Sequence, residues 1–184
     1  MFYLNLQRVY IRDFVINDLL DVYEYSSNPK VGPNAGWPEH KNISETKNIL
    51  ISIINKKETF AIVNKQNNKV IGSIGVYKDE KRNNPNCCMI GYVLNESYWG
   101  KGIMKEVLSG FIRYLFFCTN INLISIYHFP FNLRSKRVIE KCGFKYEGIL
   151  RKATLMYDGK LQDNVCYSLT KEEYMINESK QFLN

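Results

Sequence analysis

Trp99-Gly100-Lys101-Gly102-Ile103-Met104 is the stretch of sequence on which the fold prediction rests. It follows the apolar run Cys87 to Leu94, which is typical of a buried strand. It also opens the segment 102–118, where apolar residues recur at helical spacing along one broad face. A further strand pattern follows at Leu123 to His128. A strand, a glycine turn, a long helix and a second strand form a right-handed crossover, which predicts a mixed α/β sheet.

The glycine turn itself is a candidate anion site. A helix that begins directly after such a turn has unpaired N–H groups and partial positive charge at its first residues. Gly100 and Gly102 let the backbone approach a phosphate closely, and Lys101 adds a cation. The spacing matches neither the loop that binds nucleoside triphosphates nor the dinucleotide fingerprint. Taken alone, the turn is equally consistent with tight packing.

The rest of the chain alternates strand and helix patterns without a repeat or a linker. In chain order we expect a strand at 8–12, a helix at 17–27 capped by Asn17, a loop at 28–40, a helix capped by Ser44-Glu45-Thr46-Lys47, strands at 59–63 and 70–77, a short helix from Asn132 to Cys142-Gly143, and strands at 144–150 and 165–169 joined through Tyr157-Asp158-Gly159-Lys160. The strands at 59–63, 70–77 and 87–94 are expected to form an antiparallel meander.

Length and composition indicate one domain over residues 1–184. The chain is 45% hydrophobic and 14% aromatic, which is enough for a sizeable core. No apolar run approaches the roughly 20 residues that a bilayer requires, and the N-terminus lacks the regions of a signal peptide. We therefore expect a soluble, cytoplasmic protein that does not bind a membrane.

The formal net charge of +7 raises the question of nucleic-acid binding. The basic residues are scattered, however, and the densest charged run, Lys78 to Arg82, mixes both signs as a solvated loop does. The surplus better suits a phosphate-rich cofactor or an acidic partner. No nucleic-acid partner is predicted.

The five cysteines indicate neither disulfides nor a metal site. They are odd in number, and no C-x-x-C pair or histidine cluster accompanies them. We expect small buried apolar residues in a reducing compartment, and no bound metal.

Three motifs in order give the sequence a specific resemblance. They are Ile90 to Met104, Asn132-Leu133-Arg134-Ser135, and Glu140-Lys141-Cys142-Gly143-Phe144. Gly36-Trp37-Pro38-Glu39-His40 and Asp158-Gly159-Lys160 agree with them. Together they resemble the GNAT superfamily of acyl-CoA N-acyltransferases, and within it the branch of bacterial ribosomal-protein N-terminal acetyltransferases. The resemblance covers nearly the whole chain.

The resemblance implies a fold and a cosubstrate. The fold is a mixed, mostly antiparallel sheet of about six or seven strands with about four helices, splayed open beside the glycine turn. The cosubstrate is acetyl-CoA. Its pyrophosphate would bind the backbone N–H groups of Gly100, Lys101, Gly102, Ile103 and Met104. Leu94 would pair with the pantetheine through its backbone, and Asn132 would reach it, although Asn132 could also be a plain helix cap.

The general acid is expected to be Ser135, which matches the nearer branch and would protonate the departing thiolate. The position where many family members carry a tyrosine is Ile139 here. Ser135 could instead simply satisfy the helix end. Tyr127 and His128 are reserve candidates, of which strand alternation lets only one face the site.

The general base is not evident. Met89 and Thr154 stand where relatives carry acidic residues. Glu147 and Asp163 could finish a water relay, or could be structural acceptors. An α-amine with a pKa of about 7.7–8.0 loses its proton at pH 7 for about 1 kcal/mol, against about 4.6 kcal/mol for a lysine amine. A missing base therefore favours an α-amine acceptor.

The predicted activity is transfer of an acetyl group from acetyl-CoA to a primary amine, by direct attack in a ternary complex. The acceptor would be a protein N-terminal α-amine or a small amine. Alternatives are acetylation of a polyamine or a toxic amine, which requires an acidic groove, and a non-catalytic acyl-CoA sensor. Trp37 and His40 are acceptor-site candidates, and Lys101 with Lys136 or Arg137 would contact the cofactor as cations. Either a monomer or a homodimer is compatible.

Overall fold

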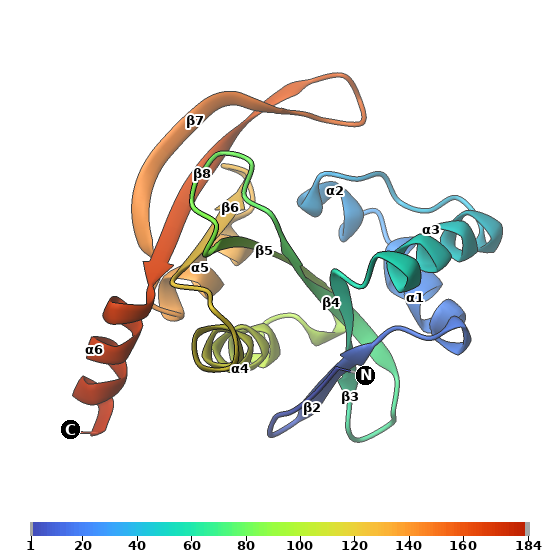
Figure 1. Ribbon diagram of the computed structural model, residues 1–184. Coiled ribbons are helices and arrows are strands. Elements are labelled where there is room, and N and C mark those ends of the chain that lie inside the picture. The colour runs from blue at the N-terminus through green and yellow to red at the C-terminus, as the bar shows by residue number, and fades with distance from the viewer. Residues whose placement is uncertain (1, 183–184) are drawn as a thin grey trace.

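The central feature of the computed structural model, which describes residues 2–182, is an eight-stranded sheet in the order β1-β2-β3-β4-β5-β6-β8-β7 (Figure 1). The strands are β1 (Tyr3–Asn5), β2 (Val9–Asp13), β3 (Thr59–Asn64), β4 (Val70–Tyr77), β5 (Cys87–Leu94), β6 (Leu123–His128), β7 (Lys145–Leu155) and β8 (Leu161–Thr170). Only the β5–β6 pair is parallel. The mixed, mostly antiparallel sheet is confirmed, with β1 as an additional edge strand.

Six helices accompany the sheet, rather than about four. They are α1 (Leu19–Ser26), α2 (Gly32–Ala35), α3 (Ile43–Lys56), α4 (Ile103–Cys118), α5 (Leu133–Lys141) and α6 (Lys171–Phe182). The short α2 lies inside the segment 28–40 that was expected to be a loop, and α6 follows the last strand. A single turn is too short to show helical periodicity, which explains why α2 escaped the sequence pattern.

Two predicted helix caps are wrong. Asn17 lies within the 3-10 turn Ile16–Asp18, and α1 begins only at Leu19. Asp18 determines this geometry, because its carboxylate accepts the Val15 N–H at 2.9 Å and pairs with Arg12 at 2.7 Å. The cap of α3 is Asn42, whose side chain accepts the Glu45 N–H at 2.9 Å, so Ser44 belongs to the helix.

The sheet separates two apolar clusters. On β3, Ile62 packs with α4, whereas Ala61 and Val63 pack with α1 and α3. Because neighbouring strand residues point to opposite faces, α4 and α5 cover one face and α1 to α3 cover the other (Figure 1). The predicted broad apolar face of α4 is confirmed, with Phe111 and Phe116 fully buried.

The parallel strands β5 and β6 part along their length. Their pairing is confined to Cys87–Met89 opposite Leu123–Ser125, although β5 continues to Leu94 and β6 to His128. Beyond the paired residues, backbone groups on the facing edges have no partner strand. A wedge-shaped gap therefore opens in the middle of the sheet, beside the glycine turn.

A long hairpin of β7 and β8 extends well beyond the predicted strands 144–150 and 165–169. It turns through Met156 to Lys160, near the predicted Tyr157–Lys160 turn, where the Met156 N–H donates to the Lys160 carbonyl at 2.8 Å and the Gly159 N–H donates to the Met156 carbonyl at 3.0 Å. The hairpin arches over the sheet towards the side where α2 lies (Figure 1). It forms one wall of the site described below.

Among residues 2–182, no helix is long and apolar enough to cross a membrane. Three cysteines, Cys87, Cys88 and Cys166, are buried as expected, whereas Cys118 is exposed.

Candidate functional site

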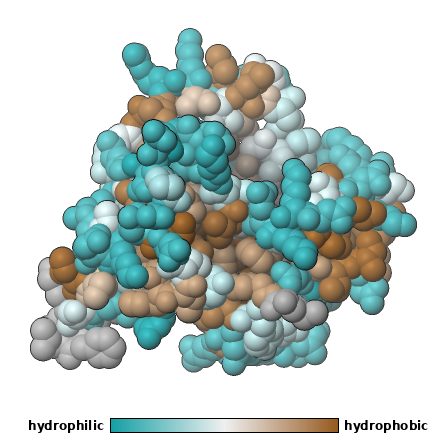
Figure 2. Space-filling model, in the orientation of Figure 1, coloured by the Kyte–Doolittle hydropathy of each residue, from teal (hydrophilic) through white to brown (hydrophobic). Residues whose placement is uncertain are grey.

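A first cavity of about 430 Å³ lies where the glycine turn, the end of β5, α2 and α5 converge. Apolar surface lies in the hollow near the middle of this face, surrounded by hydrophilic side chains (Figure 2). Seven of the eight site residues predicted from sequence line the cavity: Leu94, Gly100, Gly102, Ile103, Met104, Asn132 and Ser135. Leu94 and Ser135, which are 41 positions apart in the sequence, are thus brought together around one space.

The glycine turn presents unpaired backbone donors. Gly100 and Gly102 have φ of 74° and 73°, in the left-handed region that favours glycine. The first N–H of this region that donates within the described chain is that of Glu106, to the Gly102 carbonyl at 3.2 Å. The N–H groups of residues 100–105 are therefore free for an anion at the start of α4.

Arg8 holds this turn from the other end of the chain. Its Nε donates to Glu106 at 2.6 Å, and its backbone N–H donates to the same carboxylate at 2.7 Å. Its guanidinium also donates to the Lys101 carbonyl at 2.7 Å. Lys101 does not line the cavity, and its ammonium lies 5.5 Å from the Tyr98 ring centroid. The prediction of Lys101 as a cationic side-chain contact is therefore not supported by its placement.

Other basic side chains surround the cavity. Lys105 from α4 and three residues of α5, Arg134, Arg137 and Lys141, line it. Arg137 was one of two predicted alternatives; the other, Lys136, is paired with Glu140 at 3.8 Å. Four cations around one cavity create the positive potential that a phosphate-rich ligand requires.

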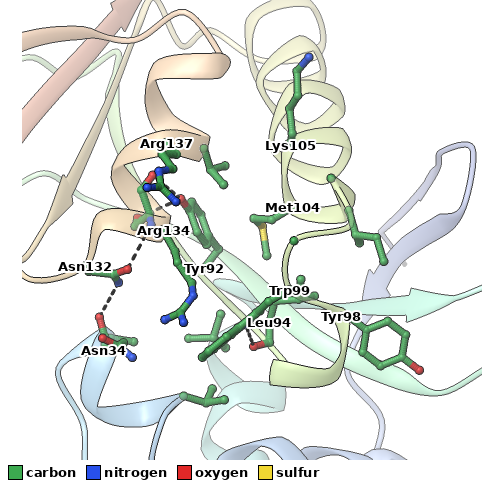
Figure 3. Close-up of a pocket in the computed structure, with 18 of the residues that line it drawn as sticks. Asn34, Tyr92, Leu94, Tyr98, Trp99, Met104, Lys105, Asn132, Arg134 and Arg137 are labelled. Atoms are coloured by element: carbon green, nitrogen blue, oxygen red, sulfur yellow. Dashed lines mark hydrogen bonds between the residues drawn. The ribbon is translucent and has the colours of Figure 1, made fainter.

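Trp99 and Arg134 bridge the cavity. The Trp99 indole N–H donates to the Leu94 carbonyl at 2.8 Å, which ties the turn to the end of β5. Arg134 extends from α5 so that its guanidinium lies 4.5 Å from the Trp99 ring (Figure 3). This cation–π contact joins the wall formed by α5 to the wall formed by the glycine turn.

Asn132 is the cap of α5. Its side-chain oxygen accepts the Ser135 N–H at 3.1 Å, and its amide nitrogen donates to the Asn34 carbonyl at 2.9 Å (Figure 3). Asn132 thus caps α5, and its hydrogen bond to the Asn34 carbonyl also holds α5 against α2. One amide hydrogen and one oxygen lone pair remain for another partner.

A tyrosine and a serine form the polar centre of the site. The Tyr92 hydroxyl lies 3.0 Å from the Ser135 hydroxyl, and burial raises the pKa of Tyr92. Ile139, the position where many relatives carry a tyrosine, is fully buried. The sequence interpretation considered only the backbone at Tyr92. Tyr92 lies two residues from each of the core residues Ile90 and Leu94 of β5, and this spacing was the signal that its side chain points to the face covered by α4 and α5.

A second cavity of about 300 Å³ adjoins the first. Asn34, Ala35, Tyr92, Asn132 and Ser135 line both. The residues that line only the second include Lys81, Met89, Tyr127, His128, Thr154 and Asn164. Both Tyr127 and His128 line it, contrary to the expectation that only one could, because the gap between β5 and β6 exposes both faces of β6 to the same space.

His128 is an acceptor in this arrangement. Its side chain is 6% exposed, and Nδ1 lies 2.8 Å from the Phe129 carbonyl, so Nδ1 carries the hydrogen. In the neutral ring, Nε2 then has only a lone pair, and within the described chain it has no hydrogen-bond partner. An unpaired buried nitrogen costs about 1–3 kcal/mol.

Asp79 is buried beside the second cavity, although the run Lys78 to Arg82 was expected to be solvated. Its side chain accepts from the hydroxyls of Ser125 at 2.6 Å and Tyr127 at 2.5 Å, and from Arg82 at 3.1 Å. Burial alone would raise the pKa of Asp79, but the hydrogen bonds from Ser125 and Tyr127 outweigh it and hold the pKa below its ordinary value. The Tyr127 proton is committed to this carboxylate, which also disfavours Tyr127 as the acid.

The remaining predicted residues lie elsewhere. Trp37 packs on His40 at 5.2 Å, and the His40 ring bonds to Thr46 at 2.9 Å, so neither lines the two cavities. Glu147 pairs with Arg82 and accepts from Ser168 at 2.8 Å. Asp163 accepts the Lys152 N–H at 2.7 Å. These contacts are structural, and the proposed acceptor-site and relay roles are not supported.

The family model described as "Acetyltransferase (GNAT) domain" matches residues 8–145. Among curated proteins, an uncharacterized N-acetyltransferase p20 of Bacillus licheniformis is 28% identical over 91% of this chain and 96% of its own length. The [ribosomal protein uS5]-alanine N-acetyltransferase of Escherichia coli is 30% identical over 62% of this chain and 58% of its own length.

Solved structures show the same fold. The crystal structure of a GNAT-family acetyltransferase from Bacillus anthracis superimposes with a TM-score of 0.84 at 24% identity, covering 93% of this chain and 99% of that one.

Asp79 should be a major contributor to stability. Asp79→Asn removes the negative charge that faces Arg82 and, with its oxygen towards Ser125 and Tyr127, turns an amide donor against the Lys81 N–H, so the free energy of unfolding should fall by about 3 kcal/mol at pH 7. Because the folded pKa lies below the unfolded value, the carboxylate stabilises the fold above about pH 4 and this contribution is lost as the pH falls through the folded pKa.

Urea unfolding at neutral and acidic pH measures both effects. The control is Asp158→Asn, an exposed carboxylate paired with Lys160, which should change little. An equal loss for the two variants at pH 7, or a difference that does not shrink in acid, would contradict this role of Asp79.

Proposed function

The chain belongs to the GNAT acetyltransferase family and is an acetyl-CoA-dependent acetyltransferase; from that premise we propose that its acceptor is the α-amine of a polypeptide N-terminus. One observation carries the proposal: the second cavity adjoins the first, and its polar lining consists of amide and hydroxyl side chains with Lys81 and His128, with no Asp or Glu among its described lining residues. Such a surface suits a peptide backbone and a neutral amine.

Acetyl-CoA occupies the first cavity in this proposal. The free N–H groups of residues 100–105 receive the pyrophosphate at the positive end of α4. Arg134, Arg137, Lys105 and Lys141 supply the neighbouring positive charge. Arg134 must leave or share its contact with Trp99 to do so, because that contact spans the cavity.

The pantetheine arm runs along the unpaired edge of β5 towards the gap. The Leu94 carbonyl already accepts from Trp99, so its second lone pair is the one left for the cofactor. The remaining valences of Asn132 face the same space. The thioester then reaches the residues shared by both cavities, next to Tyr92 and Ser135.

The amine nitrogen attacks the thioester carbonyl from the second cavity. A C–N bond forms, the C–S bond breaks, and the nitrogen loses a proton to water. The thiolate takes a proton from Ser135 as Ser135 takes one from Tyr92 across the 3.0 Å hydrogen bond, and water returns to Tyr92 the proton that the nitrogen released. Tyr127 does not compete for this role, since its proton goes to Asp79.

The magnitudes favour an α-amine over a lysine amine or polyamine. With no carboxylate lining the cavity, deprotonation costs about 1 kcal/mol for an α-amine and about 4.6 kcal/mol for a lysine amine at pH 7. The Escherichia coli relative, whose name assigns it to an alanine of ribosomal protein uS5, acts on this kind of acceptor. A polyamine would need the acidic groove that the lining lacks.

The placement of the pyrophosphate predicts the effect of Gly102→Asp. A carboxylate at the start of α4 crowds and repels the phosphates, so acetyl-CoA affinity should fall at least about 30-fold, or about 2 kcal/mol. Isothermal titration calorimetry measures it. Gly159→Asp is the matched control, because Gly159 has φ 79° in the distant β7–β8 turn. Wild-type affinity in Gly102→Asp would refute the placement.

The acceptor is tested by thiol release with a panel of amines. Peptides with free N-terminal alanine or serine should react with a kcat/KM at least about 100-fold above that of spermidine, kanamycin or an N-acetylated peptide whose only amine is lysine. Preference for the polyamine or aminoglycoside would overturn the α-amine proposal. Binding of acetyl-CoA without turnover of any amine would favour the acyl-CoA sensor instead.

Ser135 and Tyr92 are tested as the proton source. Ser135→Ala should lower kcat about tenfold, because Tyr92 can donate less directly, and combination with Tyr92→Phe should lower it about 100-fold. Neither change should weaken acetyl-CoA binding. An unchanged kcat in Ser135→Ala would remove Ser135 as the acid.

A further inference from the structure

A buried carboxylate stands one side chain behind the second cavity. Asp79 is 2% exposed and does not line the cavity, whereas Tyr127, which does, donates its hydroxyl hydrogen to Asp79 at 2.5 Å. Tyr127 lies at the end of β6, and Asp79 lies in the loop after β4. The tyrosine thus connects the space proposed for the acceptor amine to a negative charge.

The carboxylate determines which way the Tyr127 hydroxyl points. Ser125 donates to the same oxygen of Asp79 at 2.6 Å, Arg82 donates to it at 3.1 Å, and the Lys81 N–H donates to the other oxygen at 3.0 Å. Four donors keep Asp79 ionised and immobile. Burial and the bond to Asp79 raise the pKa of Tyr127, so the phenol keeps its proton. Its oxygen can offer only a lone pair to anything else.

An amine nucleophile needs this kind of partner. Its lone pair must stay free to attack the thioester carbonyl, and a hydroxyl that donated to the nitrogen would occupy that lone pair. A hydroxyl that only accepts binds an N–H instead and directs the lone pair away from itself. The positive charge of Lys81, whose ammonium lies 4.4 Å from the Tyr127 ring centroid, favours the neutral form of an amine held there.

We propose that Tyr127 accepts a hydrogen bond from the acceptor amine and that Asp79 is a positioning residue that keeps the Tyr127 hydroxyl from donating to the nucleophile. This inference rests on the proposed function, because it assumes that the amine enters through the second cavity. It assigns a role in the reaction to Asp79, which belongs to the charged run Lys78 to Arg82 whose sequence is typical of a solvated loop. It also explains how an amine is oriented where Met89 and Thr154 replace the acidic residues of relatives.

A double-mutant cycle tests the direction of the hydrogen bond. Tyr127→Phe removes the acceptor, and kcat/KM for a peptide with N-terminal alanine should fall about tenfold, mainly through KM. Asp79→Ala removes the acceptor of the Tyr127 hydroxyl and frees that hydroxyl to donate to the amine, so kcat/KM should fall about 100-fold. In the double variant no hydroxyl remains, and the rate should recover to about that of Tyr127→Phe.

The recovery separates this role from a structural one. If Asp79 only stabilises the fold, Asp79→Ala will lower the rate equally with and without the Tyr127 hydroxyl, which would overturn the inference. Rates are measured at a temperature where thermal unfolding shows every variant to be folded. Tyr146→Phe is the control, since Tyr146 is 58% exposed on β7 and should leave kcat/KM unchanged.

A binding measurement keeps the two proposals distinguishable. The same alanine peptide is titrated into CoA-saturated protein by calorimetry, and its affinity should fall about tenfold in Tyr127→Phe while acetyl-CoA affinity stays the same. A wild type that binds the peptide but never acetylates it would refute the proposed function, and the affinity comparison would still decide the role of Tyr127. Equal peptide affinity in wild type and Tyr127→Phe, or no peptide binding by the wild type, would overturn the inference.

Discussion

The parting of β5 and β6 after three paired residues is the constraint on which the rest of this structure depends. A parallel pair in mid-sheet normally continues, because every broken ladder bond leaves a donor and an acceptor without partners. Here side chains at the borders of the gap form hydrogen bonds that hold its edges in place. Trp99 takes the Leu94 carbonyl at the end of β5, and Asn132 caps α5 and docks it to α2. The gap is therefore a built opening through which two cavities communicate.

Hydrogen-bond direction differs on the two sides of that opening. On the side covered by α5, Tyr92 and Ser135 form a hydroxyl pair with protons to give. On the other side, Asp79 fixes the hydroxyl of Tyr127, and the Phe129 carbonyl fixes the tautomer of His128, so both present lone pairs. Proton donors towards the thiolate and acceptors towards the amine are what acetyl transfer requires. This asymmetry, more than any single residue, supports the proposed direction of the reaction.

Much of the site followed from local pattern. The periodicity of α4 located the start of the helix, and the glycines before it indicated free N–H groups, which the left-handed φ angles of Gly100 and Gly102 explain. Asn132 followed from its place before a short helix. The direction of the Lys101 side chain did not follow from the pattern, because a side chain within a turn can point either way; its carbonyl accepts from Arg8, and its ammonium lies 5.5 Å from the Tyr98 ring centroid.

Sequence by itself indicated most of the strands and helices in chain order and the crossover around the glycine turn, since these depend on residues close together in the chain. Its resemblance to the GNAT superfamily implied the cosubstrate, whereas β1, α2 and α6 did not follow from it. Only the tertiary structure decided which side chains meet. Arg8 clamps Glu106 across 98 positions, and Asp79 reaches Tyr127 across 48. The burial of Asp79 and the unpaired Nε2 of His128 also depend on where strands part. Charge and periodicity describe a residue's own segment, whereas burial and hydrogen-bond direction are properties of the neighbours that folding brings to it.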